Sequence, residues 1–291
     1  MKIGVVYPQI ELQGRPSAIG RFALAAEKLG YQHLSVYDHV VGAAHEGRTP
    51  PLTGPYTERD PFDDPLMMFA HLSGITRRLE FCTSIMILPQ RQTVLLARQA
   101  ADLDLLSNER LRLGVGTGWN YVEYDALNED FATRGLRLDE QIDALRQLWN
   151  GPLTTFHGRF HNIQSVALNP LPKRQIPIWL GGFAEPAYRR AGRTGDGFIF
   201  ANGLSASKAG WESVRQHLED AGRDLASFGR DFITGPVDKG RVRDSILQWR
   251  DLGGTHGTVG TIGRGFTEVE AHIDFISEVR ELLGSEMPAT P

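Results

Sequence analysis

The stretch LEFCTSIMILPQRQTVLLARQAADLDLLSNERLRLGVGTG, residues 79–118, contains the unit that decides the fold. Its first apolar run, Leu79–Leu88, includes β-branched residues and predicts a buried strand. Thr93–Leu106 predicts a helix, which Asn108 can end because asparagine tolerates the left-handed conformation. Leu111–Val115 then predicts a second strand. Two strands joined through a helix form a right-handed crossover and imply a parallel sheet.

The same alternation continues on both sides of this unit. Short apolar runs predict further strands at Lys2–Tyr7, His33–Tyr37, Ile176–Leu180, Gly197–Phe200, Asp231–Thr234 and Thr258–Ile262. Helical patterns predict helices at Pro16–Leu29, Arg137–Trp149, Pro186–Arg193, Trp211–Ala221, Ser245–Leu252 and Thr267–Leu283. Eight such units favour a closed (β/α)₈ TIM barrel over an open sheet. We therefore expect one TIM-barrel domain over residues 1–284.

Two segments interrupt the alternation. Gly42–Pro65, rich in proline, glycine and charged residues, predicts an inserted loop after strand two, of the kind that covers an active site. Phe156–Leu171 predicts a short hairpin before strand five. We expect the last residues, 285–291, to be a disordered tail.

Composition excludes several classes of function. The formal net charge of −4 gives no electrostatic reason to expect binding to nucleic acid or to an anionic membrane. The single cysteine, Cys82, cannot form an intrachain disulfide and is expected to be a small buried hydrophobe, which fits a reducing compartment. The chain starts with a strand, and no apolar run approaches the roughly 18 residues of a membrane span. These features predict a cytoplasmic protein.

Residues that end the predicted strands are the first candidates for chemistry, because reacting groups of such barrels lie at the carboxyl ends of the strands. Asp38 and His39 end strand two. A histidine there points into the mouth and titrates where proton transfer is useful, and a neighbouring carboxylate can accept backbone or ligand hydrogen bonds. The alternative is a turn in which Asp38 caps and His39 only fills space.

Glycine-rich turns follow two other strands. Gly114, Gly116 and Gly118 allow a flat ligand to approach the backbone closely, or they only relieve crowding at the rim of the barrel. They do not form a dinucleotide-binding fingerprint, because Trp119 occupies the position of its third glycine. Gly181-Gly182-Phe183 precedes a helix, whose free N–H groups can bind phosphate.

Two common types of catalytic centre are missing from the sequence. There is no His-x-His on strand one and no His-Glu-x-x-His, so we expect no metal site. There is also no Gly-x-Ser-x-Gly elbow of a serine hydrolase.

Several motifs occur together in the first two thirds of the chain: Leu88–Ser107, Arg110–Asn120, Glu123-Tyr124, Arg134-Gly135, Pro177–Gly182, Arg190-Ala191 and Gly195–Gly197. On these motifs the sequence resembles the luciferase-like flavin and deazaflavin enzymes. The resemblance covers roughly residues 1–200, in the family's order. Within that part, the Gly118-Trp119-Asn120 version of the fourth-strand motif is similar to a subgroup that uses coenzyme F420, a deazaflavin.

The resemblance implies a tricyclic ring across the barrel mouth. A non-prolyl cis peptide, here Ser84–Ile85, would support the ring, and Asp38-His39 would lie against it beside the substrate. Further contacts would come from Gly116, Thr117 and Trp119, and the cofactor's phosphate would bind at Gly181, Gly182 and Phe183. Deazaflavin sugar dehydrogenases of this family carry a proton-donating glutamate where this chain has Trp119, so the resemblance does not extend to sugar-phosphate oxidation. Family members often form homodimers.

The leading hypothesis is an F420-dependent oxidoreductase that transfers hydride to or from a small organic substrate. His39 would move the accompanying proton, and Asp38 would orient the ring or His39. The first alternative is an FMN-dependent monooxygenase that receives reduced flavin from a separate reductase and uses O₂. The second is a catalytically silent flavin-binding protein.

Overall fold

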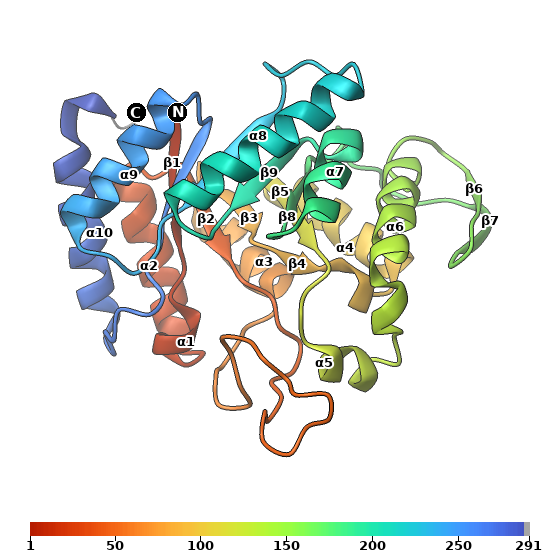
Figure 1. Cartoon of the computed structure of the whole chain (residues 1–291), viewed down its shortest axis with the longest axis horizontal. Coiled ribbons are helices and arrows are strands. Elements are labelled where there is room, and N and C mark those ends of the chain that lie inside the picture. The colour runs from red at the N-terminus through yellow and green to blue at the C-terminus, as the bar shows by residue number, and fades with distance from the viewer. Residues whose placement is uncertain (288–291) are drawn as a thin grey trace.

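Parallel strands form the centre of the structure, a computed structural model that describes residues 1–287 (Figure 1). They are β1 (Lys2–Val6), β2 (His33–Val36), β3 (Glu80–Thr83) followed by β4 (Met86–Ile87), β5 (Leu111–Gly116), β8 (Ile178–Gly181), β9 (Gly197–Phe200), β10 (Gly229–Ile233) and β11 (His256–Val259). Each strand is parallel to its neighbours, and the β1–β11 and β3–β5 pairs close the sheet. The predicted eight-stranded (β/α)₈ barrel is confirmed for the described residues.

Helices surround the barrel (Figure 1). They are α1 (Gln9–Leu12), α2 (Pro16–Lys28), α3 (Pro65–Ile75), α4 (Thr93–Leu106), α5 (Tyr121–Ala126), α6 (Arg134–Leu148), α7 (Glu185–Thr194), α8 (Leu204–Asp220), α9 (Lys239–Asp251) and α10 (Val269–Leu283). Helix α2 illustrates why they form. Pro16 has the fixed φ that suits a first turn, and Ile19, Phe22 and Ala26 bury one face of the helix.

Side chains fill the inside of the barrel. Val6, Cys82, Trp179, Ile199 and Ile233 form one buried cluster, and the partly buried Ile85 packs against it. A second and larger cluster includes residues of the strands and of the surrounding helices. Because the interior is packed, a ligand site has to lie at one of the two ends of the barrel.

Two inserted segments lie where the sequence predicts them. The loop between β2 and α3 contains residues 42–64, and it lies with α5 at the lower edge of Figure 1. Tyr121 of α5 fixes the two together, since its hydroxyl donates to the carbonyl of Pro50 at 2.6 Å. The hairpin consists of antiparallel β6 (Thr154–His157) and β7 (Asn162–Val166), at the outer right of Figure 1.

Several boundaries differ from the expectations. The expected strand Leu79–Leu88 is interrupted after Thr83 and resumes as β4, before a 3₁₀ turn at Leu88–Gln90. The last strand ends at Val259 rather than Ile262. Helix α8 begins at Leu204, seven residues before the expected Trp211. Helix α3 was not expected at all.

The chain terminus lies partly outside the described residues. Gly284–Glu286 forms a 3₁₀ turn and Met287 is buried. Residues 288–291 are not described, and the domain limits proposed from the sequence stay a prediction. Within the described part of the chain, the helices are too short or too polar to cross a membrane. The same residues contain no group of three or more histidine, cysteine, aspartate or glutamate side chains placed to hold a metal ion.

Candidate active site at the barrel mouth

His39 is held by a carboxylate that follows a different strand. Its Nδ1 lies 3.0 Å from Oε2 of Glu123, in the first turn of α5. The other oxygen of Glu123 accepts hydrogen bonds from the backbone amides of Val40 and Val41. The Glu123 side chain is fully buried and that of His39 is 8% exposed. Both carboxylate oxygens are therefore used to fix residues 39–41 at the mouth.

Aromatic rings enclose the His39 imidazole. Its centroid lies 4.8 Å from the ring of Phe62, 5.5 Å from that of Tyr56 and 5.7 Å from that of Trp119, all at steep angles. Trp119 also lies under Gly54, where an added Cβ atom would come within 2.3 Å of the indole. Burial, followed by the charges of Asp60 and Glu11, raises the pKa of Tyr56 to about 12, so its phenol stays uncharged. The wall around His39 is thus aromatic and neutral.

Asp38 does not hold His39, contrary to one expected role. Its carboxylate accepts from the backbone amide of Ile87 at 2.9 Å and from Nη2 of Arg91 at 2.6 Å. Arg91 also bridges to Asp64, the N-cap of α3, at 3.0 Å. Because Asp38 is buried and already bound to these partners, it fixes the end of β2 to β4. The orienting carboxylate is Glu123 instead.

The expected cis peptide between Ser84 and Ile85 is present. Ile85 lies over two glycines: a Cβ atom on Gly181 would be 2.5 Å from Ile85 Cγ2, and one on Gly116 would be 2.7 Å from Ile85 Cδ1. The Ser84 hydroxyl lies 3.5 Å from the Cys82 sulfur. The glycines of β5 and β8 therefore allow Ile85 to close the barrel interior as a flat apolar platform.

Two further predicted segments lie at the same end of the barrel. The Thr117 carbonyl accepts from the Tyr124 hydroxyl at 2.7 Å, which ties the turn after β5 to α5. Gly182 has φ +150°, a conformation that favours glycine, and Phe183 is exposed. The following helix, α7, has no side-chain hydrogen bond at its N-cap. The backbone amides of this turn are therefore available to an anion.

Sequence reasoning assigned no role to Glu123, Arg91, Tyr56 or Phe62. A local signal for Glu123 does exist, since Asn120 and Glu123 have the spacing of a helix capping box. Asn120 does cap α5, accepting from the amides of Val122 and Glu123. The Glu123 carboxylate, however, reaches across to His39.

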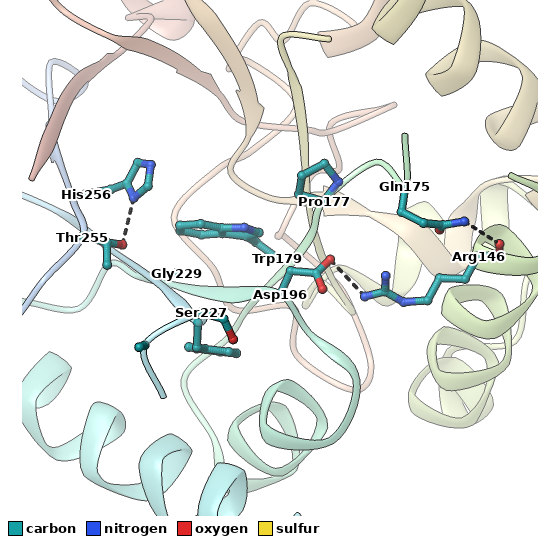
Figure 2. Close-up of a pocket in the computed structure, with 11 residues that line it drawn as sticks. Arg146, Gln175, Pro177, Trp179, Asp196, Ser227, Gly229, Thr255 and His256 are labelled. Carbon is teal, nitrogen blue, oxygen red and sulfur yellow. Dashed lines mark hydrogen bonds and ion pairs between the residues drawn. The ribbon is translucent and has the colours of Figure 1, made fainter. Parts of the chain in front are cut away.

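A separate cavity of about 420 Å³ opens at the amino ends of the strands (Figure 2). Trp179 and His256 line it, together with the Arg146–Asp196 ion pair. None of the residues proposed from the sequence as site residues borders it. The predicted site residues instead gather at the opposite, carboxyl end.

Known proteins resemble this chain in sequence and in fold. An uncharacterized protein of Mycobacterium tuberculosis is 35% identical over 245 residues, which cover 78% of this chain and 83% of the relative. The F420-dependent glucose-6-phosphate dehydrogenase of Gordonia bronchialis is 30% identical over 223 residues, 74% of this chain and 62% of that enzyme. Among solved structures, an F420-dependent secondary alcohol dehydrogenase in complex with an F420–acetone adduct superposes with a TM-score of 0.78. It is 18% identical, and the match covers 96% of this chain and 98% of that one, so it shows the shared fold.

A family profile also matches most of the chain. The profile of the luciferase-like monooxygenases fits residues 1–234, more than three quarters of the chain. This chain therefore belongs to the luciferase-like monooxygenase family and is an oxidoreductase of that family.

Proposed function

We propose that this protein is a coenzyme F420-dependent oxidoreductase that acts on a small, uncharged alcohol or carbonyl compound. The observation that carries the proposal is the position of His39 in an aromatic enclosure, linked through Asp38 to the Ile85 segment. The deazaflavin dependence of the Gordonia relative supports the choice of cofactor.

The residues at the mouth fit a planar tricyclic group. Ile85 presents a partly exposed apolar platform that exists only because Gly116 and Gly181 have no side chains. Thr117 and Trp119 lie in the turn after β5, and Gly181–Phe183 offer amides to a phosphate. Asp38 would act indirectly, by fixing the backbone of Ile87 beneath the group. When bound, the deazaflavin accepts or supplies a hydride at its carbon five.

His39 would move the proton. In the oxidative direction, the C–H bond of an alcohol breaks as hydride leaves, and its O–H proton passes to Nε2 of His39 while the C=O bond forms. The reverse reaction returns that proton to the carbonyl oxygen. Phe62, Tyr56 and Trp119 would exclude water from the reacting atoms.

The enclosure supports an uncharged substrate rather than a sugar phosphate. None of the described ring and hydrogen-bond contacts of His39 involves a basic side chain. Arg91, the cation tied to this segment, is neutralised by Asp38 and Asp64. A sugar phosphate would need a cation or an anion-binding turn for its own phosphate.

A cytoplasmic location and a homodimer are further parts of the proposal. The buried free thiol of Cys82 fits a reducing compartment, and the dimer is an expectation from the family.

Cofactor titration followed by a substrate screen tests the proposal. Purified protein should quench or shift the fluorescence of F420 at micromolar concentration and bind FMN more weakly. The loaded protein should then oxidise short secondary alcohols, or reduce the matching ketones, and leave glucose 6-phosphate unchanged. Tighter binding of FMN with O₂-dependent turnover would favour the monooxygenase alternative, which would require a separate reductase. Binding with no turnover on any substrate would favour a silent flavin-binding protein.

A further inference from the structure

The geometry points to Glu123 as the positioning residue that selects the tautomer of His39. This inference rests on the proposed function, because it assigns the proton-transfer atom of the same site. A carboxylate can only accept hydrogen bonds. At 3.0 Å from Glu123 Oε2, the Nδ1 atom of His39 must therefore carry a hydrogen. In the neutral ring, the lone pair is then left on Nε2.

Glu123 is fixed independently of His39. Its second oxygen accepts from the amides of Val40 and Val41, and its position in the first turn of α5 suits a negative charge. Among the described residues, its one ion-pair partner is His39, with no arginine or lysine in contact. The carboxylate is thus free to stabilise the positive charge that arises when Nε2 takes a proton.

No described residue bonds Nε2 of His39. Since the two nitrogens lie on different sides of the imidazole ring, anchoring Nδ1 at α5 turns Nε2 away from α5. Glu123 therefore leaves Nε2 of His39 as the acceptor for a substrate hydroxyl; in the reverse reaction, the protonated Nε2 is the donor to a carbonyl. This supplies a proton-transfer group although the family's glutamate is replaced by Trp119.

Replacing Glu123 by glutamine inverts this arrangement. The amide oxygen of a Glu123→Gln variant can still accept from Val40 and Val41, and its NH₂ group then faces His39 Nδ1. Nδ1 must become the acceptor, so the hydrogen moves to Nε2 and the catalytic lone pair is lost. In a catalytic triad, the equivalent carboxylate-to-amide change lowers turnover by about 10⁴-fold. We expect a fall in kcat of about 10²–10⁴-fold, with little change in KM or in F420 affinity.

The chain provides a matched control in Glu140. Its carboxylate accepts from the amides of Arg159, Phe160 and His161, and its Oε1 lies 2.8 Å from His161 Nδ1. In this pair the same oxygen, Oε1, accepts from the amides of Phe160 and His161 and faces His161 Nδ1, and the pair joins α6 to the β6–β7 hairpin on the outside of the barrel (Figure 1). A Glu140→Gln variant should keep its amide oxygen at that position, because an NH₂ group there would face two backbone N–H donors, so both the His161 tautomer and turnover should stay unchanged.

The decisive measurement is the tautomer of each histidine in the free protein. Long-range proton–nitrogen NMR spectra distinguish the two tautomers, and a His39→Gln variant identifies the signals of His39. The expected result is a change at His39 in Glu123→Gln, together with the fall in kcat. In a His39→Ala background, Glu123→Gln should cost no further turnover, which a general loss of folding would not reproduce.

Two outcomes would overturn the inference. One is an unchanged His39 tautomer in Glu123→Gln, and the other is an inverted tautomer with wild-type kcat. Failure of the proposed function is seen separately, as a wild-type protein that turns over no substrate with F420. The NMR result on the free protein still decides the role of Glu123 in that case.

Discussion

Two histidines in this barrel, His39 and His33, meet buried carboxylates at opposite ends of the strands. His39 follows β2 and receives Glu123 from a short helix, with aromatic rings on its other sides. His33 begins β2, and its Nε2 lies 2.7 Å from the Thr258 hydroxyl and 3.4 Å from Asp231. Thr258 donates its own hydrogen to Asp231, so it must accept from His33 Nε2. The two histidines therefore carry their hydrogens on different nitrogens.

The His39–Glu123 and His33–Asp231 pairs differ mainly in their surroundings. Burial lowers the pKa of His33, with the nearby charge of Arg112 acting in the same direction. Burial alone would raise the pKa of Asp231, but His33 and Arg112 hold it well below its usual range. Arg112 lies over the Trp179 ring and reaches Asp231 at 3.3 Å. Asp231 neutralises an arginine inside the barrel and so supports the fold, whereas the ion-pair partner of Glu123 among the described residues is a histidine at the mouth.

The largest effect should come from removing the interior carboxylate. Asp231→Ala leaves the Arg112 guanidinium buried without a counter-charge, and the free energy of unfolding should fall by about 3–5 kcal/mol. Urea unfolding followed by circular dichroism measures it. Asp251→Ala, which removes an exposed partner of Arg250, is the control and should cost less than about 1 kcal/mol. Equal losses in the two variants would contradict the structural role of Asp231.

Of the two histidines, only His39 at the mouth should be needed for turnover. His39→Ala should lower kcat by about 10²–10⁴-fold, because the proton-transfer group is lost. His33→Ala should keep the turnover per folded molecule, since His33 lies fully buried in the barrel. Steady-state kinetics with the F420-loaded variants, corrected for the folded fraction, measures both. Similar losses of kcat in the two variants would contradict the assignment of catalysis to His39 and of a purely structural role to His33.

Glycines at the two ends of the barrel should show the same difference, with smaller effects on stability. A Cβ atom on Gly116 would meet Ile85 at the mouth, and one on Gly229 would meet Trp179 at the amino end, 1.9 Å from its Cζ2. Overpacking of this kind costs about 1–3 kcal/mol, so both alanine variants should be less stable. Only Gly116→Ala should also weaken F420 binding, measured by fluorescence titration. Gly74→Ala, with no atom within 4 Å of the new Cβ, is the control for both effects.

The fold could be predicted because its signals are local. Thr93–Leu106 and Gly197–Phe200 have the bounds that their apolar patterns predict. Helix α3 was missed although Asp64 and Pro65 form a regular helix start, with Asp64 accepting from the amides of Leu66 and Met67. Its sequence, PLMMFAHLSGI, has no clear polar face, so no helical period marked it out.

The site could be predicted only in part, for a physical reason. His39 and Gly181–Phe183 could be proposed because they directly follow strands, and strand ends of a barrel share one edge. Glu123 lies 84 residues after His39 in the chain. Its local spacing with Asn120 predicts a helix cap equally well, and only the packing of α5 against the loop after β2 decides between the two roles. The His33–Asp231 pair likewise depends on barrel closure between segments 198 residues apart.

The pH dependence of stability gives the smallest of the expected effects and tests the interior pair directly. His33 stays neutral in the folded barrel because its pKa is lowered, whereas the unfolded chain binds a proton at His33 near its ordinary value of 6.5. Its contribution to stability is therefore complete above pH 6.5 and is lost progressively as the pH falls below it. Each such site adds a slope of at most about 1.4 kcal/mol per pH unit. Urea unfolding of His33→Gln between pH 7.5 and 5 should show a flatter slope than the wild type, by up to about that amount. Parallel curves would mean that His33 takes up a proton in the folded barrel. Burial would then not keep His33 neutral and would not explain how it differs from His39.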